Sequence, residues 1–123
     1  MAAEVANTHI AAGADVLTGS AQQVVGAIGV ADEAGVPWLG TQQDQSPLSD
    51  IVLATQQYDW TAMILDMIVK QQAGEAGGDV YQLTLTNNGL QMLLSDSLPD
   101  DVKAAAQAAI DGIVSGEIDP SGE

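Results

Sequence analysis

The sequence predicts an α/β domain with a mainly parallel β-sheet covered by helices on both faces. Short apolar runs alternate along the chain with longer segments that carry an apolar stripe at helical spacing. The 123 residues are 46% hydrophobic, with no Phe, so the core consists chiefly of small aliphatic side chains that let helices pack closely on a sheet. A chain of this length is expected to form one domain with its own core.

The first half of the chain predicts two helices and three strands. Gly13 and Gly35 are suitable stops for the helices, and Ser20 is a suitable N-cap for the second helix. The polar stretch GTQQDQS, residues 40–46, directly follows the second strand. The predicted elements are a helix over 4–12, a strand over 14–18, a helix over 21–34, and strands over 36–40 and 51–55.

The second half predicts two further helices and a hairpin. Asp59 is a plausible N-cap for a helix that runs to about Gln72, and Pro99 and Gly116 bound a last helix. The alternating residues 80–85, the turn signal Asn88-Gly89 and the run 90–94 predict a β-hairpin near Asn88-Gly89. The side chains expected in the core are Met63, Ile64, Leu65, Met67 and Ile68 on the first of these helices and Val102, Ala106, Ala109, Ile110 and Ile113 on the second.

These elements fill residues 1–118, and residues 119–123 are expected to be a loose tail. No stretch has the length of a membrane-spanning segment, and the N-terminus lacks the basic and apolar regions of a signal peptide. The sequence therefore predicts no membrane insertion.

The charge balance excludes several classes of partner. Asp and Glu number 17 against two basic residues, Lys70 and Lys103, which gives a formal net charge of −15. Nucleic acid is an unsuitable partner, because phosphate binding requires clustered Lys and Arg. The charge indicates high solubility or, more sharply, adaptation to high salt, where self-repulsion is screened.

No motif predicts catalysis, a metal or a cofactor. The chain has no Cys, and it lacks a Ser-His-Asp order, a phosphate-binding P-loop and a deaminase pattern. His9 is expected on a helix surface, and the glycines of residues 26–29 lie within a predicted helix. Asp44, Asp50 and Asp59 are too scattered for a metal loop. We therefore predict a protein that is not an enzyme.

Binding residues are expected where strands end, since open α/β sheets bind ligands beyond the carboxyl ends of their strands. Four loops lie there, and their amide and hydroxyl groups suit a neutral polyhydroxyl or heteroaromatic ligand better than a phosphate. The loops are 18–20, 42–45, 56–60 and 86–88. The candidate ligand-binding residues are Gly19, Ser20, Gln42, Asp44, Gln45, Gln57, Tyr58, Asp59 and Trp60.

Each candidate also has a purely structural interpretation. Gly19-Ser20 at a helix start could hold an anion, but such a pair is more often only a cap. Residues 42–45 could be an ordinary solvated loop. Trp60 could stack on a base or sugar, or pack on its own domain, and Asp59 could serve only as an N-cap.

Four segments together resemble a known family. In chain order they are ADVLTGSAQQVVGAIGVADEAGVPWLGTQQDQSPL, DIVLATQQYDW, GDVYQLTLTNNGLQ and LPDDVKAAAQAAIDGIVSGEI. They are similar to the C-terminal part of the BMP family, the basic membrane lipoprotein or PnrA-like substrate-binding proteins of ABC transporters. The resemblance covers nearly the whole chain but less than half of a typical family member.

The resemblance implies a lobe of the type I periplasmic-binding-protein fold, flavodoxin-like in its layers. It implies binding of a nucleoside or purine, delivery to an ABC permease, and an extracellular or periplasmic location, commonly with a lipid anchor on an N-terminal Cys that this chain lacks. The family often carries Val-Asp-x-Asp-Gln after the second strand here. Gln42 takes the place of the first Asp of that pattern, and Asp44 and Gln45 match the later residues.

Three interpretations stay open: a fragment of a longer protein, a half-length protein that pairs with itself or another chain, and a scaffold that no longer binds ligand. The alternative function is accordingly a small acidic structural or interaction domain, homodimeric, with a vestigial ligand site. A flavodoxin-like signalling or enzyme domain is a third idea. A receiver domain would need a lysine at a strand end, where neither Lys70 nor Lys103 lies.

Overall fold

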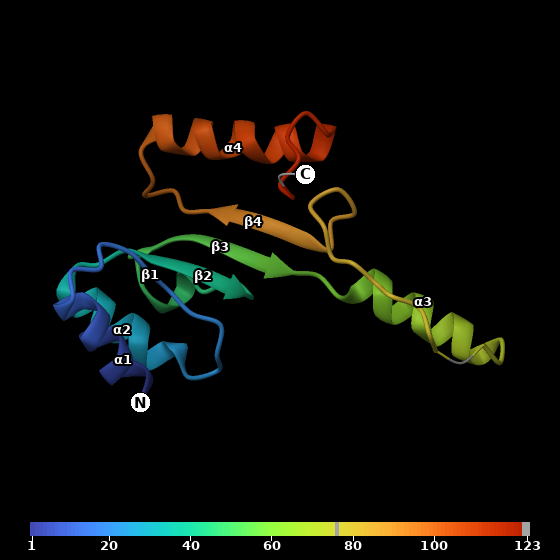
Figure 1. Ribbon diagram of the computed structural model, residues 1–123, viewed down its shortest axis with the longest axis horizontal. Coiled ribbons are helices and arrows are strands. Elements are labelled where there is room, and N and C mark those ends of the chain that lie inside the picture. The colour runs from blue at the N-terminus through green and yellow to red at the C-terminus, as the bar shows by residue number, and fades with distance from the viewer. Residues whose placement is uncertain (76, 122–123) are drawn as a thin grey trace.

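The computed structural model describes residues 1–75 and 77–121 (Figure 1). Helices and strands alternate through most of it, as the sequence predicts. The elements are α1 (Ala2–Ala11), β1 (Leu17–Thr18), α2 (Val24–Ala34), β2 (Trp38–Gln42), the 3₁₀ helix η1 (Ser46–Leu48), β3 (Val52–Tyr58), α3 (Thr61–Gln72), β4 (Leu90–Leu94) and α4 (Asp100–Ser115).

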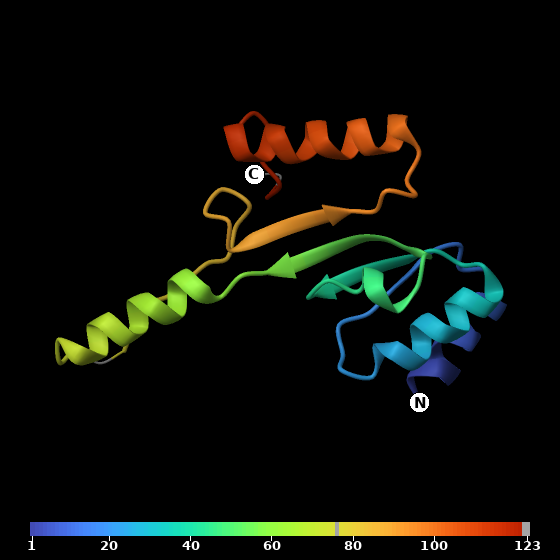
Figure 2. The ribbon, with the colours of Figure 1, turned by 180° about the vertical axis from the view of Figure 1, so that it is seen from behind.

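The four strands form one sheet in the order β1-β2-β3-β4. The first three strands are parallel, and β4 pairs antiparallel with β3. The prediction of a mainly parallel sheet is therefore confirmed. Helices α1 and α2 lie together on one side of the strands, and α4 lies beyond β4 on the other side (Figures 1 and 2).

The core is small and lies where α1 and α2 meet the first strands. Its buried apolar residues include Trp38, Ile28 and Val52, each at most 2% exposed. Small side chains, such as those of Ala6 and Ala31, let the two helices approach each other closely. Gly35 ends α2 in the left-handed conformation, and Gly116 does the same for α4, as predicted.

The start of α2 differs from the prediction. The helix begins at Val24 with Gln23 as the N-cap, so Ser20 does not cap it. Residues 21–23 form a turn instead, and the Ser20 hydroxyl accepts a hydrogen bond from Gln42. Strand β1 is also shorter than expected, with only Leu17–Thr18 in the sheet.

The predicted hairpin is wrong in its pairing. Asn88 has the expected positive φ, 59°, but residues 80–85 form no strand. The free edge of β3 offers β4 five paired positions, 54–58 with 90–94. Asn87 instead holds the 82–84 segment in a loop, donating to the carbonyl of Gln82 and accepting from the amide of Thr84. Residues 56–58, expected to be loop, consequently belong to β3.

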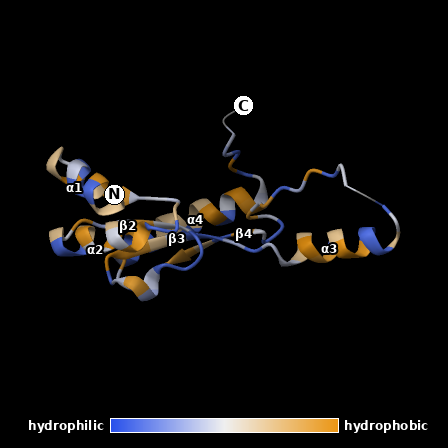
Figure 3. Ribbon diagram, turned by 90° about the horizontal axis from the view of Figure 1, so that it is seen from below, coloured by the Kyte–Doolittle hydropathy of each residue, from blue (hydrophilic) through white to orange (hydrophobic). Residues whose placement is uncertain are grey.

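The buried sides predicted for the last two helices are also wrong. Helix α3 has no buried residue, and Gly112 is the buried residue of α4. Figure 3 shows α3 projecting away from the sheet with a largely hydrophobic ribbon. Ile64, Leu65, Met67 and Ile68, four of the side chains predicted for its buried side, are 47–57% exposed. Of the tail predicted over 119–123, residues 122–123 lie outside the described residues, and Asp119 accepts hydrogen bonds from Ser121.

Candidate functional site

The parallel strands bring three candidate residues to one edge of the sheet. Gln42 at the end of β2 lies opposite Gln57 of β3 in the strand register. The Gln42 side-chain amide donates to the Ser20 hydroxyl at 2.6 Å. Ser20, Gln42 and Gln57 thus form a row of residues with hydroxyl or amide side chains near the carboxyl ends of β1 to β3, where open α/β sheets bind ligands.

Gln42 has an unusual backbone. Its φ is +76°, in the left-handed backbone region that residues other than Gly and Asn rarely adopt. Such a conformation costs of order 1–3 kcal/mol and persists where the surroundings enforce it, often in ligand-binding segments. The strain turns the chain at the end of β2 and places the Gln42 amide beside Ser20.

A second contact ties the β1–α2 loop to β2. The Thr41 hydroxyl donates to the carbonyl of Gly19 at 2.7 Å. A Cβ added to Gly19 would lie 3.2 Å from the side chains of both Trp38 and Val24, which is too close for comfortable packing. Gly19 therefore lets this loop approach the core and fixes the position of Ser20.

Gln45 stands apart from the other candidates because its side chain is buried, at 5% exposure. Its Oε1 accepts from the indole nitrogen of Trp38 at 2.8 Å, and its Nε2 donates to the carbonyl of Thr41 at 3.0 Å. Both ends of the amide are engaged within the protein. Gln45 therefore positions the loop and satisfies Trp38.

Two candidate aspartates shape local turns. Asp44 accepts a hydrogen bond from the amide of Ser46, and Asp59 accepts one from the amide of Thr61, the first residue of α3, both at 2.9 Å. Hydrogen bonds from the side chain and the backbone of Thr61 lower the pKa of Asp59 below 3.8. Asp59 thus satisfies an N–H at the start of α3, although the residue directly before the helix is Trp60.

Tyr58 and Trp60 form an aromatic pair at the end of β3. Their ring centroids are 5.8 Å apart, and the planes meet at 89°, an edge-to-face contact. Trp60 remains 47% exposed, so part of its ring is free to stack on a planar ligand. The aromatic pair lies between Gln57 and the start of α3 along the chain.

The candidate residues line several shallow hollows. Gln42, Asp44 and Gln45 line a hollow of about 420 Å³ between the start of α2 and the loop after β2. Gly19 and Ser20 line a more apolar one of about 290 Å³ against α1, and a third of about 490 Å³ beside α3 includes Asp59. These candidates therefore line three separate hollows and do not share one cavity.

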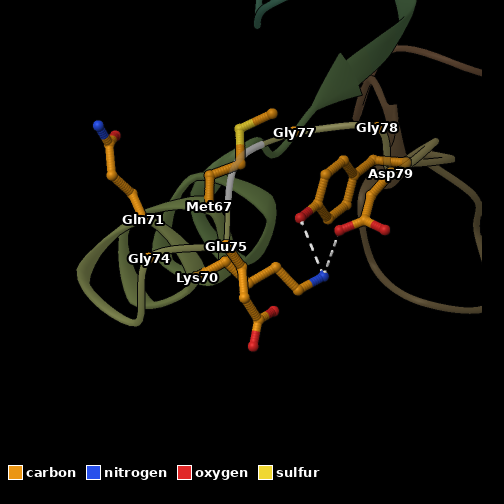
Figure 4. Close-up of a pocket in the computed structure, with 9 residues that line it drawn as sticks. Met67, Lys70, Gln71, Gly74, Glu75, Gly77, Gly78 and Asp79 are labelled. Carbon is orange, nitrogen blue, oxygen red and sulfur yellow. Dashed lines mark hydrogen bonds and ion pairs between the residues drawn. The ribbon is translucent and has the colours of Figure 1, made fainter.

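A larger hollow, of about 500 Å³, lies away from the strand ends (Figure 4). In it Lys70 forms ion pairs with Asp66 at 2.8 Å and Asp79 at 2.7 Å, and the Tyr81 hydroxyl donates to Asp66. These four side chains satisfy one another, so we assign them a structural role and call them the Lys70 cluster. Sequence reasoning missed the cluster, although the i,i+4 spacing of Asp66 and Lys70 indicates an ion pair.

Over residues 1–75 and 77–121, no group of three or more His, Cys, Asp or Glu side chains could hold a metal ion. Within the same residues, no helix is long and apolar enough to cross a bilayer.

The sequence matches no protein-family model and no curated protein. Solved structures share the fold. A transcriptional activator of the comK gene from Bacillus halodurans is 17% identical, with a TM-score of 0.78 over 95% of this chain and 42% of that one. An ABC transporter solute-binding protein from Conexibacter woesei is 23% identical (TM-score 0.62; 95% and 40%), and one from Aeropyrum pernix is 17% identical (0.73; 96% and 43%).

These similarities establish an α/β lobe of the kind found in solute-binding proteins. The chain spans about two-fifths of the length of the proteins that it matches.

Proposed function

We propose that this chain is a solute-binding lobe that takes a small neutral ligand, a nucleoside or purine-like molecule, without catalysing a reaction. In this role it would act outside the cytoplasmic membrane and deliver the ligand to an ABC permease, as the BMP-type resemblance implies. The observation that carries the proposal is the row of Ser20, Gln42 and Gln57 at the strand ends, with Gln42 held in a strained conformation.

The chemistry of this row favours an uncharged ligand. Amides and hydroxyls donate and accept, as ribose hydroxyls and purine edges require. The basic side chains that could neutralise a phosphate are engaged elsewhere, Lys70 in its cluster and Lys103 with Asp96. Gln42 offers hydrogen bonds without the charge assistance of a carboxylate, so affinity for ribose would be modest.

The exposed ring of Trp60 supplies the apolar part of the proposed site. Stacking of a base on an aromatic side chain contributes about 1–3 kcal/mol and tolerates different bases. A nucleoside could place its base on Trp60 and its sugar toward Gln57 and Gln42, which are paired across β3 and β2. The two solute-binding neighbours support this class of function through their fold.

A second candidate function is a homodimeric interaction domain with a vestigial ligand site. The hollows around the candidate residues are separate, and Gln45 is fully engaged within the protein. The Bacillus halodurans neighbour, described as a transcriptional activator, carries the same fold. In this function the polar strand ends would be a solvated surface.

Ligand binding is tested by thermal shift in high salt, with nucleosides, free purines and free sugars as probes. We expect nucleosides to raise Tm, and Trp60→Ala and Gln42→Ala to reduce that rise several-fold while Tm without ligand falls little. Gln107→Ala is the matched control, because it removes an exposed glutamine amide from α4, away from the strand ends.

Two outcomes would contradict the proposal. If no probe raises Tm at high ligand concentration, the isolated chain does not bind this class of molecule. If both variants lose Tm in proportion to their loss of ligand response, Trp60 and Gln42 pack the fold instead of holding a ligand.

A further inference from the structure

Helix α3 and the chain that follows it border a hollow of about 490 Å³, which we call the α3 hollow. Met63, Leu65 and Leu83 supply apolar side chains to it, and Asp59 and Asp66 supply carboxylates. Pockets for small organic molecules have this size and this composition, chiefly apolar walls with a few polar groups. The α3 hollow is separate from the two hollows beside α2.

Hydrogen bonds hold both ends of the α3 hollow. At one end, the Tyr81 hydroxyl donates to Asp66 of the helix. At the other end, the backbone amide of Asp59 donates to the carbonyl of Gly89 at 2.9 Å. The wall between these points is braced by Asn87, whose side-chain amide makes three hydrogen bonds to the backbone of its own loop. A site fixed in this way needs little ordering when a ligand binds, which favours affinity.

The charge of Asp59 has no counter-charge. Its carboxylate accepts hydrogen bonds from the neutral residue Thr61, which keep its pKa low, and it forms no ion pair within residues 1–75 and 77–121. Asp66 shares the single ammonium of Lys70 with Asp79. Negative charge therefore predominates at this hollow, so that it attracts a cation and repels an anion.

The apolar walls favour an organic cation over a metal ion. An ion such as Ca²⁺ takes about six to eight oxygen ligands, whereas the carboxylates of this hollow are those of Asp59 and Asp66, beside apolar side chains. Leu65 is 57% exposed and Leu83 is half-buried, so both retain surface that an apolar group can cover. A compound with an ammonium group on an apolar body matches the carboxylates and the apolar walls together.

We propose that the α3 hollow binds a small organic ammonium compound, with its charged group at Asp59 and its apolar body against Met63, Leu65 and Leu83. An alkylammonium group is charged at neutral pH, as the Lys side chain is, and its hydrogen bond to a carboxylate is charge-assisted. This site goes beyond the proposed nucleoside function. It lies beside the nucleoside site along the chain, because Asp59 directly precedes Trp60.

Nuclear magnetic resonance of isotope-labelled methionine methyl groups tests the proposal. The four methionines are Met1, Met63, Met67 and Met92, and Met63 is the one that lines the α3 hollow. Titration with phenethylamine is expected to shift the Met63 signal to saturation and to leave that of Met92, in β4, in place. Met63→Leu assigns the signal.

Two further probes with a similar aromatic body isolate the role of charge. We expect phenethylamine to bind at least tenfold more tightly than phenethyl alcohol, and phenylacetate to leave the Met63 signal unshifted. Asp59→Asn should weaken binding of the amine at least tenfold, and it keeps the start of α3 because Asn caps helices as well as Asp. Asp101→Asn, in the first turn of α4, removes the same charge elsewhere and should leave binding unchanged.

Three results would overturn the proposal. They are equal affinity for the amine, the alcohol and the carboxylate, equal weakening in the Asp59 and Asp101 variants, and shifts of all four methionine signals that do not saturate. The last result would mean that amines collect non-specifically on an acidic surface. No nucleoside enters these titrations, so their failure leaves the proposed function untouched, and failure of nucleosides to raise Tm leaves the ammonium site untouched.

Discussion

Two glutamines in the loop after β2 have different roles. Gln42 is exposed, has a left-handed backbone and points its amide toward Ser20, whereas Gln45 is buried under Trp38. Their residue type is the same and they lie three positions apart. What separates them is burial, because a buried amide must satisfy its own donors and acceptors within the protein.

The contribution of Gln45 can be measured by truncation. Gln45→Ala leaves the indole N–H of Trp38 buried without an acceptor, and an unsatisfied buried donor costs about 1–3 kcal/mol. We expect the free energy of unfolding in urea to fall by about that amount. Gln43→Ala, in the exposed part of the same loop, should change it by less than about 0.5 kcal/mol. Equal losses in the two variants would contradict the assignment of Gln45.

Helix α3 has the sequence pattern of an amphipathic helix but none of the burial that such a pattern normally accompanies. Its ion pair and its apolar side chains are those of an amphipathic helix, yet none of its residues is buried. The Lys70 cluster holds Asp79 and Tyr81, from the segment that follows α3, against Asp66 and Lys70 of the helix. Asp66 accepts from both Lys70 and Tyr81, and these bonds lower the pKa of Asp66 below 3.8. The bond to Asp66 raises the pKa of Tyr81 above 10.0.

The two pKa shifts define the pH range over which the hydrogen bond between Tyr81 and Asp66 stabilises the fold. Because the pKa of Asp66 is lowered on folding, its contribution is complete well above pH 3.8 and is lost as the pH falls through the folded value. Because the pKa of Tyr81 is raised, its contribution is complete well below pH 10.0 and is lost as the pH rises through the folded value. The hydrogen bond between Tyr81 and Asp66 is therefore intact at neutral pH.

Ultraviolet titration of phenolate absorbance tests the hydrogen bond between Tyr81 and Asp66. The chain has two tyrosines, so Tyr58→Phe leaves Tyr81 as the only phenol. In that background, Asp66→Asn should lower the pKa of Tyr81, because the amide no longer stabilises the protonated phenol as a carboxylate does. Asp79→Asn should have a smaller effect, since Asp79 bonds to Lys70 and not to the phenol. Identical titration curves for the Asp66 variant and its parent would rule out the bond.

The whole molecule combines a small core with a large acidic surface. The buried apolar residues lie among α1, α2 and the first strands, and α3 and α4 add little to them. A formal net charge of −15 then opposes compaction through self-repulsion. Stability at this scale should depend on ionic strength more than on any single contact.

Salt dependence can be measured directly by calorimetry at fixed protein concentration. We expect Tm to rise by several degrees between low salt and about 1 M NaCl, because screening shortens the Debye length from about 30 Å at 0.01 M to about 3 Å at 1 M. Sodium chloride and sodium sulfate compared at equal ionic strength provide the control. Screening gives equal rises, whereas a much larger rise in sulfate would assign the effect to strengthened apolar burial. A Tm independent of NaCl would contradict the interpretation of a salt-adapted surface.

The sequence by itself determined the α/β class, the glycine stops after α2 and α4 and the polar ends of the parallel strands. These features follow from local signals, such as apolar spacing and left-handed glycines, that a residue and its near neighbours encode. The resemblance to a binding-protein lobe pointed to the fold that the solved structures share.

Only the tertiary structure decided which segments meet. Strand β4 paired with β3 instead of residues 80–85, Gln45 was buried beside Trp38, and Gln42 took a left-handed backbone conformation. The apolar side of α3, which its pattern placed in the core, is not buried. Pairing and burial depend on contacts between residues distant in sequence, and a helical pattern states that a side needs covering without stating what covers it.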